Sequence, residues 1–385
     1  MRIALDALPL VSSRMTGIGY CEAGQVQAMM MLHPEEQYVL QFFDKGDGVE
    51  KRKRLYYYEQ QRNVSVRQGH FSGYLYRLMT TAIPLPYRAF FGKDADITHF
   101  FNYIIPPGVA GKRIVTVHDM VYKTFPETVR GRTRFMLESG LQRSLHRADL
   151  IVTDSEFSKT EIIRYFPATE ERIRVVPCGV DKLRFSPMPP AAPAIEELKR
   201  RMHLQTNYFL YLGTLEPRKN LDRLIRAYAL LKQQHPDAPQ LVLAGGYGWR
   251  NNHIYQLVQT LHLEDDVLFT EYVPEEDVQP LLCGAMAFVF PSVYEGFGMP
   301  PLEAMACGTP VLTTRAASLP EVVGDAAVIV DPHHTEDIAQ GLEKLFLDAA
   351  LRERLQKEGL RRAAMFSWEN AAAALYDVYQ EALTR

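Results

Sequence analysis

The chain has 385 residues, of which 47% are hydrophobic and 23% charged, and its formal net charge is −3. This length suffices for two or three domains, and this composition excludes wholesale disorder and collagen-like architecture. A net charge near zero argues against a dedicated nucleic-acid binder, so we expect no nucleic-acid partner. The charge is uneven, since residues 1–188 carry +6 and the remainder −9, which suggests two domains with different partners.

Short apolar runs alternate with helical patterns from one end of the chain to the other. The runs predicted to be strands lie at 2–7, 38–43, 97–101, 113–118, 150–154, 173–177, 208–213, 240–245, 267–273, 287–290, 310–314 and 327–331. Most are near-continuous Val, Ile, Leu and Phe, which is typical of strands buried on both faces of a parallel sheet. The alternation with helices indicates βαβ units and therefore an α/β fold.

A proline-rich stretch divides these units into two series. It runs from Phe185 to Pro193 and contains four prolines, which suits a stiff linker between domains. We therefore predict two Rossmann-like, doubly wound parallel-sheet domains at residues 1–185 and 195–365. Ligands would bind at the carboxyl ends of the strands, in a cleft between the domains.

Cysteine usage and the N-terminus favour a cytoplasmic protein. Cys21, Cys178, Cys283 and Cys307 have no Cys-x-x-Cys spacing, so neither a zinc site nor a disulfide framework is expected. Charged residues within the first six positions argue against a signal peptide, and no run of 18 apolar residues is present.

A glycine-containing segment in the second half predicts an anion site. The chain passes through Gly298 and enters a helix at Pro300-Pro301, a place where proline is tolerated. The first turn of that helix offers free backbone N–H groups and the positive end of the helix dipole. Glu295 and Glu303 frame the site and could accept hydrogen bonds from sugar hydroxyls. The alternative interpretation is a set of turn glycines and surface charges.

Arg218 and Lys219 form a second candidate site at the start of another helix. Two cations at this position oppose the helix dipole, so an explanation by stability alone is weak. A diphosphate would pair with both, the arginine as a forked donor and the lysine as a point charge. A solvated basic turn is the alternative.

Five motifs then occur in order: Leu212-Gly-Thr214, Arg218-Lys219-Asn220, Glu295-x7-Glu303, Ala306-Cys-Gly-Thr-Pro-Val311 and Ser318-Leu-Pro-Glu-Val-Val-Gly-Asp-Ala-Ala327. Together they resemble the retaining GT-B glycosyltransferases of family 4, which include bacterial O-antigen mannosyltransferases. The resemblance is specific over residues 205–385. It is looser in the first half, where its counterparts are Asp6-Ala-Leu-Pro-Leu-Val11, Thr16-Gly-Ile-Gly-Tyr20, Thr116-Val-His-Asp119 and Asp154-Ser-Glu-Phe-Ser-Lys159.

The resemblance implies a nucleotide diphospho-sugar donor, held mostly by the C-terminal domain, and no metal or other cofactor. Arg218 and Lys219 would bind the diphosphate and neutralise it as it leaves, Glu303 would hold the ribose, and Glu295 and His118 would reach the transferred hexose. The other donor-binding residues implied are Gly17, Gly19, Gly213, Thr214, Tyr272, Val273, Phe297, Gly298, Met299 and Leu302. A helix at residues 366–385, with Ser367 as its N-cap, would cross back onto the first domain.

Several of these assignments have competing interpretations in the first half. Gly17 and Gly19, implied to form a loop over the phosphates, could be ordinary turn glycines. His118 with Asp119 could be read as a metal pair, although two ligands are poor support, or His118 could be a core histidine. Where relatives carry an arginine after the glycine loop, this chain has Tyr20-Cys21, which puts the role of that arginine in doubt.

The expected activity is transfer of mannose from GDP-mannose to a glycan or lipid-linked acceptor with retention of configuration, in bacterial surface polysaccharide synthesis. A UDP-hexose is the second choice of donor. A nucleotide-sugar epimerase of the same architecture and a non-catalytic glycan-binding module are the alternatives from other classes. Residues 51–77 combine four consecutive cations with aromatic residues, which suggests peripheral attachment to an anionic membrane surface, or else a solvated basic face.

Overall fold

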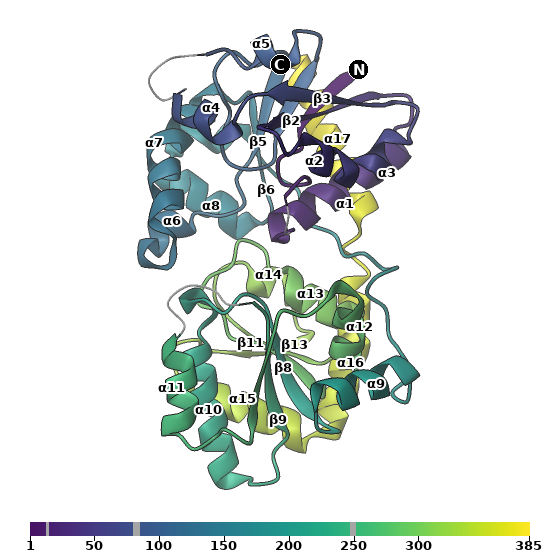
Figure 1. The fold of residues 1–385 in the computed structure, drawn as a ribbon. Helices are drawn as coiled ribbons and strands as arrows, with labels where there is room; N and C mark the ends of the chain where they lie inside the picture. Colours follow the sequence, from purple (N-terminus) through teal and green to yellow (C-terminus); the bar gives the residue numbers. More distant parts are fainter. Residues whose placement is uncertain (13–14, 80–84, 247–251) are drawn as a thin grey trace. The chain divides into compact units, whose positions relative to one another are not determined.

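The computed structural model describes residues 1–12, 15–79, 85–246 and 252–385, and it divides the chain into two compact units (Figure 1). The first unit comprises Met1–Gly179 together with Ser367–Arg385, and the second comprises Val180–Phe366. Each unit is a parallel sheet with helices packed around it. The predicted α/β fold with two Rossmann-like parallel-sheet domains is therefore confirmed.

The first unit contains a seven-stranded sheet in the order β3-β2-β1-β4-β5-β6-β7, with every pairing parallel. Its strands are β1 (Arg2–Asp6), β2 (Gln37–Asp44), β3 (Val64–His70), β4 (Ile97–Phe100), β5 (Lys112–Thr116), β6 (Leu150–Thr153) and β7 (Ile173–Val175). Neighbouring residues of one strand belong to separate apolar cores on the two faces, as Ile114 and Val115 of β5 do. This two-sided burial is what the continuous apolar runs predicted.

Strand β3 is the one element of this sheet that the apolar pattern did not predict. It lies at the sheet edge, pairs only with β2, and reads Val-Ser-Val-Arg-Gln-Gly-His, which is too polar for a two-sided strand. An edge strand needs apolar residues on fewer positions, so it gives no continuous run.

The helices of the first unit that the structure describes are α1 (Gly17–Leu32), α2 (Gly48–Arg54), α3 (Tyr56–Glu59), α4 (Gly73–Met79), α5 (Arg88–Phe91), α6 (Val121–Thr124), η1 (Pro126–Thr128), α7 (Gly131–Arg147), α8 (Glu156–Tyr165), η2 (Pro167–Arg172) and α17 (Trp368–Thr384). The last of these packs beside α1 (Figure 1). Ser367 is its N-cap and accepts a hydrogen bond from the backbone N–H of Asn370 at 3.1 Å.

The second unit contains a six-stranded parallel sheet in the order β10-β9-β8-β11-β12-β13. Its strands are β8 (Tyr208–Leu212), β9 (Gln240–Ala244), β10 (Val267–Glu271), β11 (Ala287–Phe290), β12 (Val311–Thr314) and β13 (Ala327–Val330). Its described helices are α9 (Pro193–Met202), η3 (Pro217–Lys219), α10 (Leu221–Gln234), α11 (Asn252–Thr260), α12 (Glu275–Cys283), α13 (Met299–Ala306), α14 (Leu319–Val323), α15 (Thr335–Leu347) and α16 (Ala349–Ala363).

The chain leaves the first unit a few residues before the bound expected at 185. The backbone N–H of Val180 donates to Phe366 O at 3.1 Å, and Phe185 is buried. The prolines that follow lead into α9, which begins at Pro193. The proline-rich segment therefore belongs to the second unit, which comprises Val180–Phe366.

Candidate active site

The main candidate site lies where two neighbouring strands of the second unit end. Strands β8 and β11 are paired in parallel, so their carboxyl ends lie at the same edge of the sheet. After β8 the chain forms η3, which carries Arg218 and Lys219, and after β11 it forms a loop that carries Glu295. This topology brings Glu295 next to Arg218 and Lys219, which lie 77 and 76 positions earlier in the sequence.

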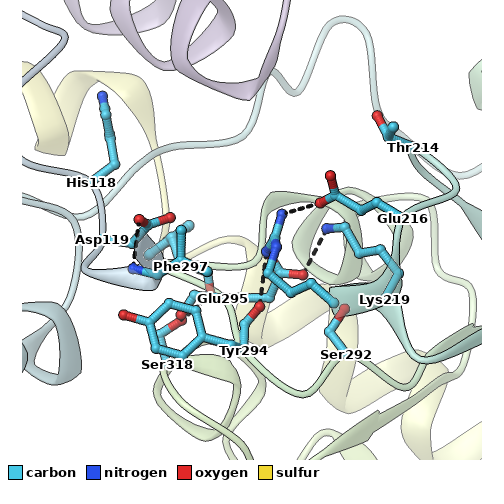
Figure 2. Close-up of polar contacts among 12 residues, drawn as sticks. His118, Asp119, Thr214, Glu216, Lys219, Ser292, Tyr294, Glu295, Phe297 and Ser318 are labelled. Atoms are coloured by element: carbon cyan, nitrogen blue, oxygen red, sulfur yellow. Dashed lines mark hydrogen bonds and ion pairs between the residues drawn. The ribbon is translucent and has the colours of Figure 1, made fainter. Parts of the chain in front are cut away.

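Arg218, Lys219 and Glu295 form one ion-pair cluster (Figure 2). The Arg218 Nη1 donates to Glu295 Oε2 at 2.5 Å and to Tyr294 O at 2.8 Å. The Lys219 Nζ donates to Glu295 Oε1 at 2.7 Å and lies 4.7 Å from the centre of the Phe290 ring. A single carboxylate is therefore shared by two cations.

The cluster is buried, and its electrostatics follow from that burial. Lys219 and Glu295 are each 7% exposed. Burial acts to raise the pKa of Glu295, but the charges of Arg218 and Lys219 outweigh it and bring that pKa to about 2. Burial and the neighbouring charge of Arg218 lower the pKa of Lys219. The two cations keep Glu295 ionised, and the charge of Glu295 in turn favours the protonated form of Lys219.

Glu216 is a member of this cluster that the sequence did not single out. Its Oε1 accepts a hydrogen bond from Arg218 Nη2 at 2.7 Å, so the guanidinium lies between two carboxylates (Figure 2). Two cations thus face two carboxylates. The sequence could have indicated Glu216 only by its position two residues before Arg218, across Pro217. A single glutamate at such a position is equally typical of a surface charge.

The loop that carries Glu295 is fixed by side chains from other motifs. The Ser318 hydroxyl lies 2.9 Å from Glu295 O and 2.7 Å from Phe297 O, within donating distance of both. The Asn220 side chain donates to Pro291 O at 3.1 Å and to Pro332 O at 2.8 Å. Both residues lie in the motifs that carry the family resemblance, and the structure gives them a positioning role.

Helix α13 begins where the glycine segment predicted a helix N-terminus. Its N-cap is Gly298, with φ +116°, a backbone conformation that favours glycine, and no side chain caps the first turn. A Cβ at this position would approach Leu319 Cδ2 to 2.9 Å. The first N–H groups of α13 have no partner within the helix, which suits an anion.

Glu303 lies one turn into α13 and is half-buried. Burial raises its pKa to about 7, opposed by the charge of Arg184. In the part of the chain that the structure describes, no residue forms a hydrogen bond to its carboxyl group. A carboxylate in this state suits a ligand that donates hydroxyl groups.

The remaining predicted donor-binding residues of this unit differ in how far they are exposed to solvent. Thr214 and Tyr272 are exposed, with Tyr272 at 63%, whereas Val273 and Phe297 are buried. Leu302 is only 1% exposed. Its side chain therefore belongs to the core, and it could meet a ligand only through its backbone. Gly213 follows the end of β8, Met299 opens α13, and both are partly exposed.

His118 lies in the first unit, two residues after the end of β5, and both of its ring nitrogens are already hydrogen-bonded. Nδ1 lies 2.7 Å from Asp154 Oδ2 and Nε2 lies 2.8 Å from Phe101 O. Burial acts to lower the pKa of His118, but the charge and hydrogen bond of Asp154 outweigh it and raise that pKa to about 9. A carbonyl and a carboxylate both accept, so His118 donates from both nitrogens as an imidazolium. Its contact with a sugar stays a prediction.

The partner of His118 is Asp154 and not the adjacent Asp119, which accepts hydrogen bonds from the Tyr103 hydroxyl at 3.1 Å and the Val121 N–H at 3.2 Å. The His118-Asp119 metal pair considered from sequence is therefore not formed. Cys21, His118 and Asp154 do place ligand atoms within 4.8 Å of one another.

The predicted glycine loop is instead the first turn of a helix. Helix α1 begins at Gly17, with Thr16 as N-cap, so Gly17 and Gly19 are helical. A Cβ at Gly19 would lie 3.2 Å from Pro9 O, which explains a small residue there by close packing. The expectation of a loop over the phosphates was wrong in this respect, although the N-terminus of α1 still offers backbone N–H groups.

Each of the four cations at residues 51–54 forms an ion pair or a hydrogen bond. Lys51 pairs with Asp47 at 2.9 Å, Arg52 with Glu59 at 2.7 Å and Lys53 with Glu50 at 2.7 Å, while Arg54 donates to Val11 O at 2.6 Å. Two of the following aromatic residues, Tyr56 and Tyr57, are exposed. Among the described residues, no helix combines the length and apolar character needed to cross a membrane.

Both units of the chain match families of known proteins. Residues 195–362 match the model of the family "Glycosyl transferases group 1", and residues 42–184 match that of "Glycosyltransferase Family 4". The chain is 38% identical, over 287 residues and 74% of each chain, to "O-antigen chain mannosyltransferase B" of Escherichia coli. It is 32% identical to "Serotype-specific mannosyltransferase WbdA" of Escherichia coli over 267 residues, which is 69% of this chain and 33% of that one.

Among solved structures, the Anabaena protein Alr3699/HepE in complex with UDP and glucose superposes with a TM-score of 0.74 over 99% of this chain and all of that one. At 18% identity this likeness concerns the fold alone. Family models cover both units and a relative is 38% identical over most of its length, so the chain belongs to the GT-B glycosyltransferases of group 1 and family 4.

Proposed function

We propose that this glycosyltransferase moves mannose from GDP-mannose to a glycan or lipid-linked acceptor in bacterial surface polysaccharide synthesis, with retention of the anomeric configuration. The two relatives described above are both named as mannosyltransferases, which supports mannose as the transferred sugar. The observation that carries the proposal is the cluster of Arg218, Lys219 and Glu295 at the ends of β8 and β11.

The proposed chemistry requires stabilisation of negative charge. Cleavage of the bond between the anomeric carbon and the diphosphate leaves charge on the diphosphate. Arg218, Lys219 and the N-terminus of α13 would stabilise that charge by preorganised hydrogen bonds and dipoles. Because cationic side chains would supply this stabilisation, no proposed step is assigned to a metal ion.

The carboxylates of the cluster are the groups that the diphosphate of a bound donor would displace from the cations. Glu216 and Glu295 occupy the two terminal nitrogens of Arg218. A diphosphate would share or replace these contacts, which lets the cations stay charged and oriented before the donor arrives. Glu295 would also accept hydrogen bonds from the hexose, and Glu303 would accept them from the ribose.

The donor is tested by thermal unfolding of the full chain with GDP-mannose, UDP-glucose, UDP-galactose and ADP-glucose. A ligand at 100 times its Kd stabilises the native state by about 2.7 kcal/mol. We expect GDP-mannose to give the largest shift. A UDP-hexose is the second candidate, because the Anabaena protein of the same fold was solved in complex with UDP and glucose. A larger shift with a UDP-hexose would replace mannose in the proposal.

Transfer and stereochemistry are tested with the donor chosen in this way and a mannose-terminated oligosaccharide as acceptor. The anomeric proton signal of the first product, observed by NMR before any equilibration, distinguishes retention from inversion. A product of inverted configuration would overturn the retaining assignment. Epimerisation of the donor sugar without transfer would favour the epimerase alternative.

Peripheral attachment to an anionic membrane surface is part of the proposal through residues 51–77. Exposed Tyr56 and Tyr57 support it, whereas the pairing of Lys51, Arg52 and Lys53 with carboxylates reduces the free positive charge. Flotation with vesicles that contain anionic lipid at low salt tests it. We expect binding that weakens when residues 51–54 are replaced by Gln or when the salt is raised. Protein that stays at the bottom of the gradient would favour a soluble acceptor.

A further inference from the structure

Two cysteines of the first unit lie in contact although they are 157 positions apart in the sequence. Cys21 lies in the second turn of α1, and Cys178 follows β7, next to the residue at which the chain leaves the unit. Their Sγ atoms are 3.0 Å apart, and both side chains are buried, at 2% and 3% exposure. A disulfide requires a separation of about 2.05 Å, so a shift of about 1 Å would join them.

The packing around the pair holds both segments in place. Trp368, the first residue of α17, lies against each of them. A Cβ at Gly24 of α1 would come within 2.2 Å of the Trp368 ring, and one at Gly179 within 2.4 Å of the Trp368 backbone nitrogen. Because both backbones are packed this closely on the same residue, the two thiols cannot easily separate.

We propose that Cys21 and Cys178 are a redox-modification site that forms a reversible disulfide with a hydroperoxide as oxidant. The Cys21 sulfur attacks the peroxide O–O bond and becomes a sulfenic acid, and its thiol proton passes to the leaving oxygen, so that the alcohol is released, or water when the oxidant is hydrogen peroxide. The Cys178 thiol then attacks that sulfur, the S–S bond forms, and a water molecule leaves. Two electrons pass from the thiols to the peroxide. A small thiol reverses the reaction by exchange.

The electrostatics of Cys178 suit the second step of this reaction. The Sγ of Cys21 lies within 4.8 Å of ligand atoms of both His118 and Asp154, which are hydrogen-bonded to each other. The hydrogen bond with Cys21 and burial both raise the pKa of Cys178, so this thiol stays protonated. Hydrogen peroxide is close to water in size and suits a buried pair.

A metal ion bound by Cys21, His118 and Asp154 is the competing explanation of this cluster. Both ring nitrogens of His118 are already hydrogen-bonded, to Asp154 and to Phe101 O. A metal would have to replace one of these contacts, whereas the disulfide uses only the two thiols that already touch. The geometry therefore favours the disulfide, and the test includes the metal as an outcome.

The experiment uses the full chain with Cys283→Ser and Cys307→Ser, so that only the proposed pair remains. After purification under reducing conditions, the protein is treated with hydrogen peroxide, and unreacted thiols are alkylated under denaturing conditions. We expect the intact mass to lose two hydrogen atoms with no alkylation, and both changes to be reversed by dithiothreitol. Because the enclosed loop is long, the melting temperature should rise by about 5 °C or more.

Cys21→Ser and Cys178→Ser in the same background are the controls and should abolish the mass change. Peptide mapping of the oxidised wild-type chain provides a second measurement that needs no substitution, and it should yield a peptide that joins Cys21 to Cys178. The proposal is overturned if both thiols remain alkylatable after oxidation, or if the purified protein holds stoichiometric metal that Cys21→Ser releases. These measurements need no sugar transfer, so they are independent of the proposed function.

Discussion

The two units each place a buried ion pair at the carboxyl ends of parallel strands, but the two sites are built differently. In the second unit, Arg218 and Lys219 pair with the side-chain carboxylates of Glu216 and Glu295, and Arg218 also donates to Tyr294 O. In the first, His118 is held by Asp154 and by the backbone oxygen of Phe101. Two adjacent cations can hold a diphosphate in place of their carboxylates, whereas the pair in the first unit has one cation, and one of its ring nitrogens is held by a backbone carbonyl. We therefore propose that the second unit binds the diphosphate of the donor.

The largest effect is expected from removing a cation of the cluster. Arg218→Ala and Lys219→Ala should lower turnover by about 10²-fold or more, the range for loss of one preorganised donor. Steady-state rates at saturating donor provide the measurement. Arg226→Ala is a matched control, because Arg226 of α10 pairs with Asp222 on the surface and should be close to wild type. Near-normal turnover in both cluster variants would contradict the proposal that the cluster of the second unit binds the diphosphate.

The two ion pairs are also expected to fail at opposite ends of the pH range. The pKa of Glu295 is lowered from 4.5 to about 2, so its contribution is full above pH 4.5 and lost as the pH falls toward 2. The pKa of His118 is raised from 6.5 to about 9, so its contribution is full below pH 6.5 and lost as the pH rises through 9. Each shift corresponds to roughly 3 kcal/mol.

Chemical denaturation of wild type, Glu295→Gln and His118→Gln across this range measures these contributions. Glu295→Gln should remove the acid-side loss and His118→Gln the alkaline-side loss. Parallel pH profiles for wild type and both variants would contradict the assigned ion pairs.

The sequence predicted the strands of the second unit well because most of them are apolar runs that end at a turn. It predicted Arg218, Lys219 and Glu295 as site residues, but not that they touch. That contact depends on β8 and β11 being neighbours, which is a property of strand order and not of local pattern. The same reason explains why the pairing of His118 with Asp154 was missed, because these residues follow the paired strands β5 and β6. Glu216 was missed because a single glutamate beside Arg218 is equally typical of a surface charge.

Wild type and Glu303→Gln are expected to differ in how their affinity for nucleotide depends on pH. Burial raises the pKa of Glu303 to about 7, so its carboxyl becomes protonated as the pH falls below that value. The ionised form is the better acceptor for ribose hydroxyls, and affinity for GDP should decline from pH 8 to pH 6. Titration calorimetry should show this decline in wild type and a flat, weaker profile in Glu303→Gln. The same profile in both would contradict the ribose assignment.

Glu216→Gln is expected to change the affinity for GDP only slightly, and to raise it where the substitutions above lower binding or turnover. Glu216 pairs with Arg218 at 2.7 Å, but both side chains remain nearly a fifth exposed. Loss of this carboxylate frees one face of the guanidinium for the diphosphate, so GDP should bind a few-fold more tightly, in line with a partly exposed pair. Weaker GDP binding would show instead that Glu216 is needed to orient Arg218.

Metal removal is expected to have no effect on activity, because in the proposed site side chains would neutralise the charge on the diphosphate. Sugar transfer should be unchanged in excess EDTA. A loss of activity restored by Mn²⁺ or Mg²⁺ would direct attention to Cys21, His118 and Asp154 of the first unit.

The central claim is that Arg218 and Lys219 form the diphosphate site, and calorimetric titration of GDP against guanosine tests it most directly. If the claim is right, wild type binds GDP much more tightly than guanosine, and Lys219→Ala loses that preference while its affinity for guanosine is kept. If Lys219→Ala and Arg218→Ala retain the full preference for GDP, the diphosphate binds elsewhere and the claim is contradicted.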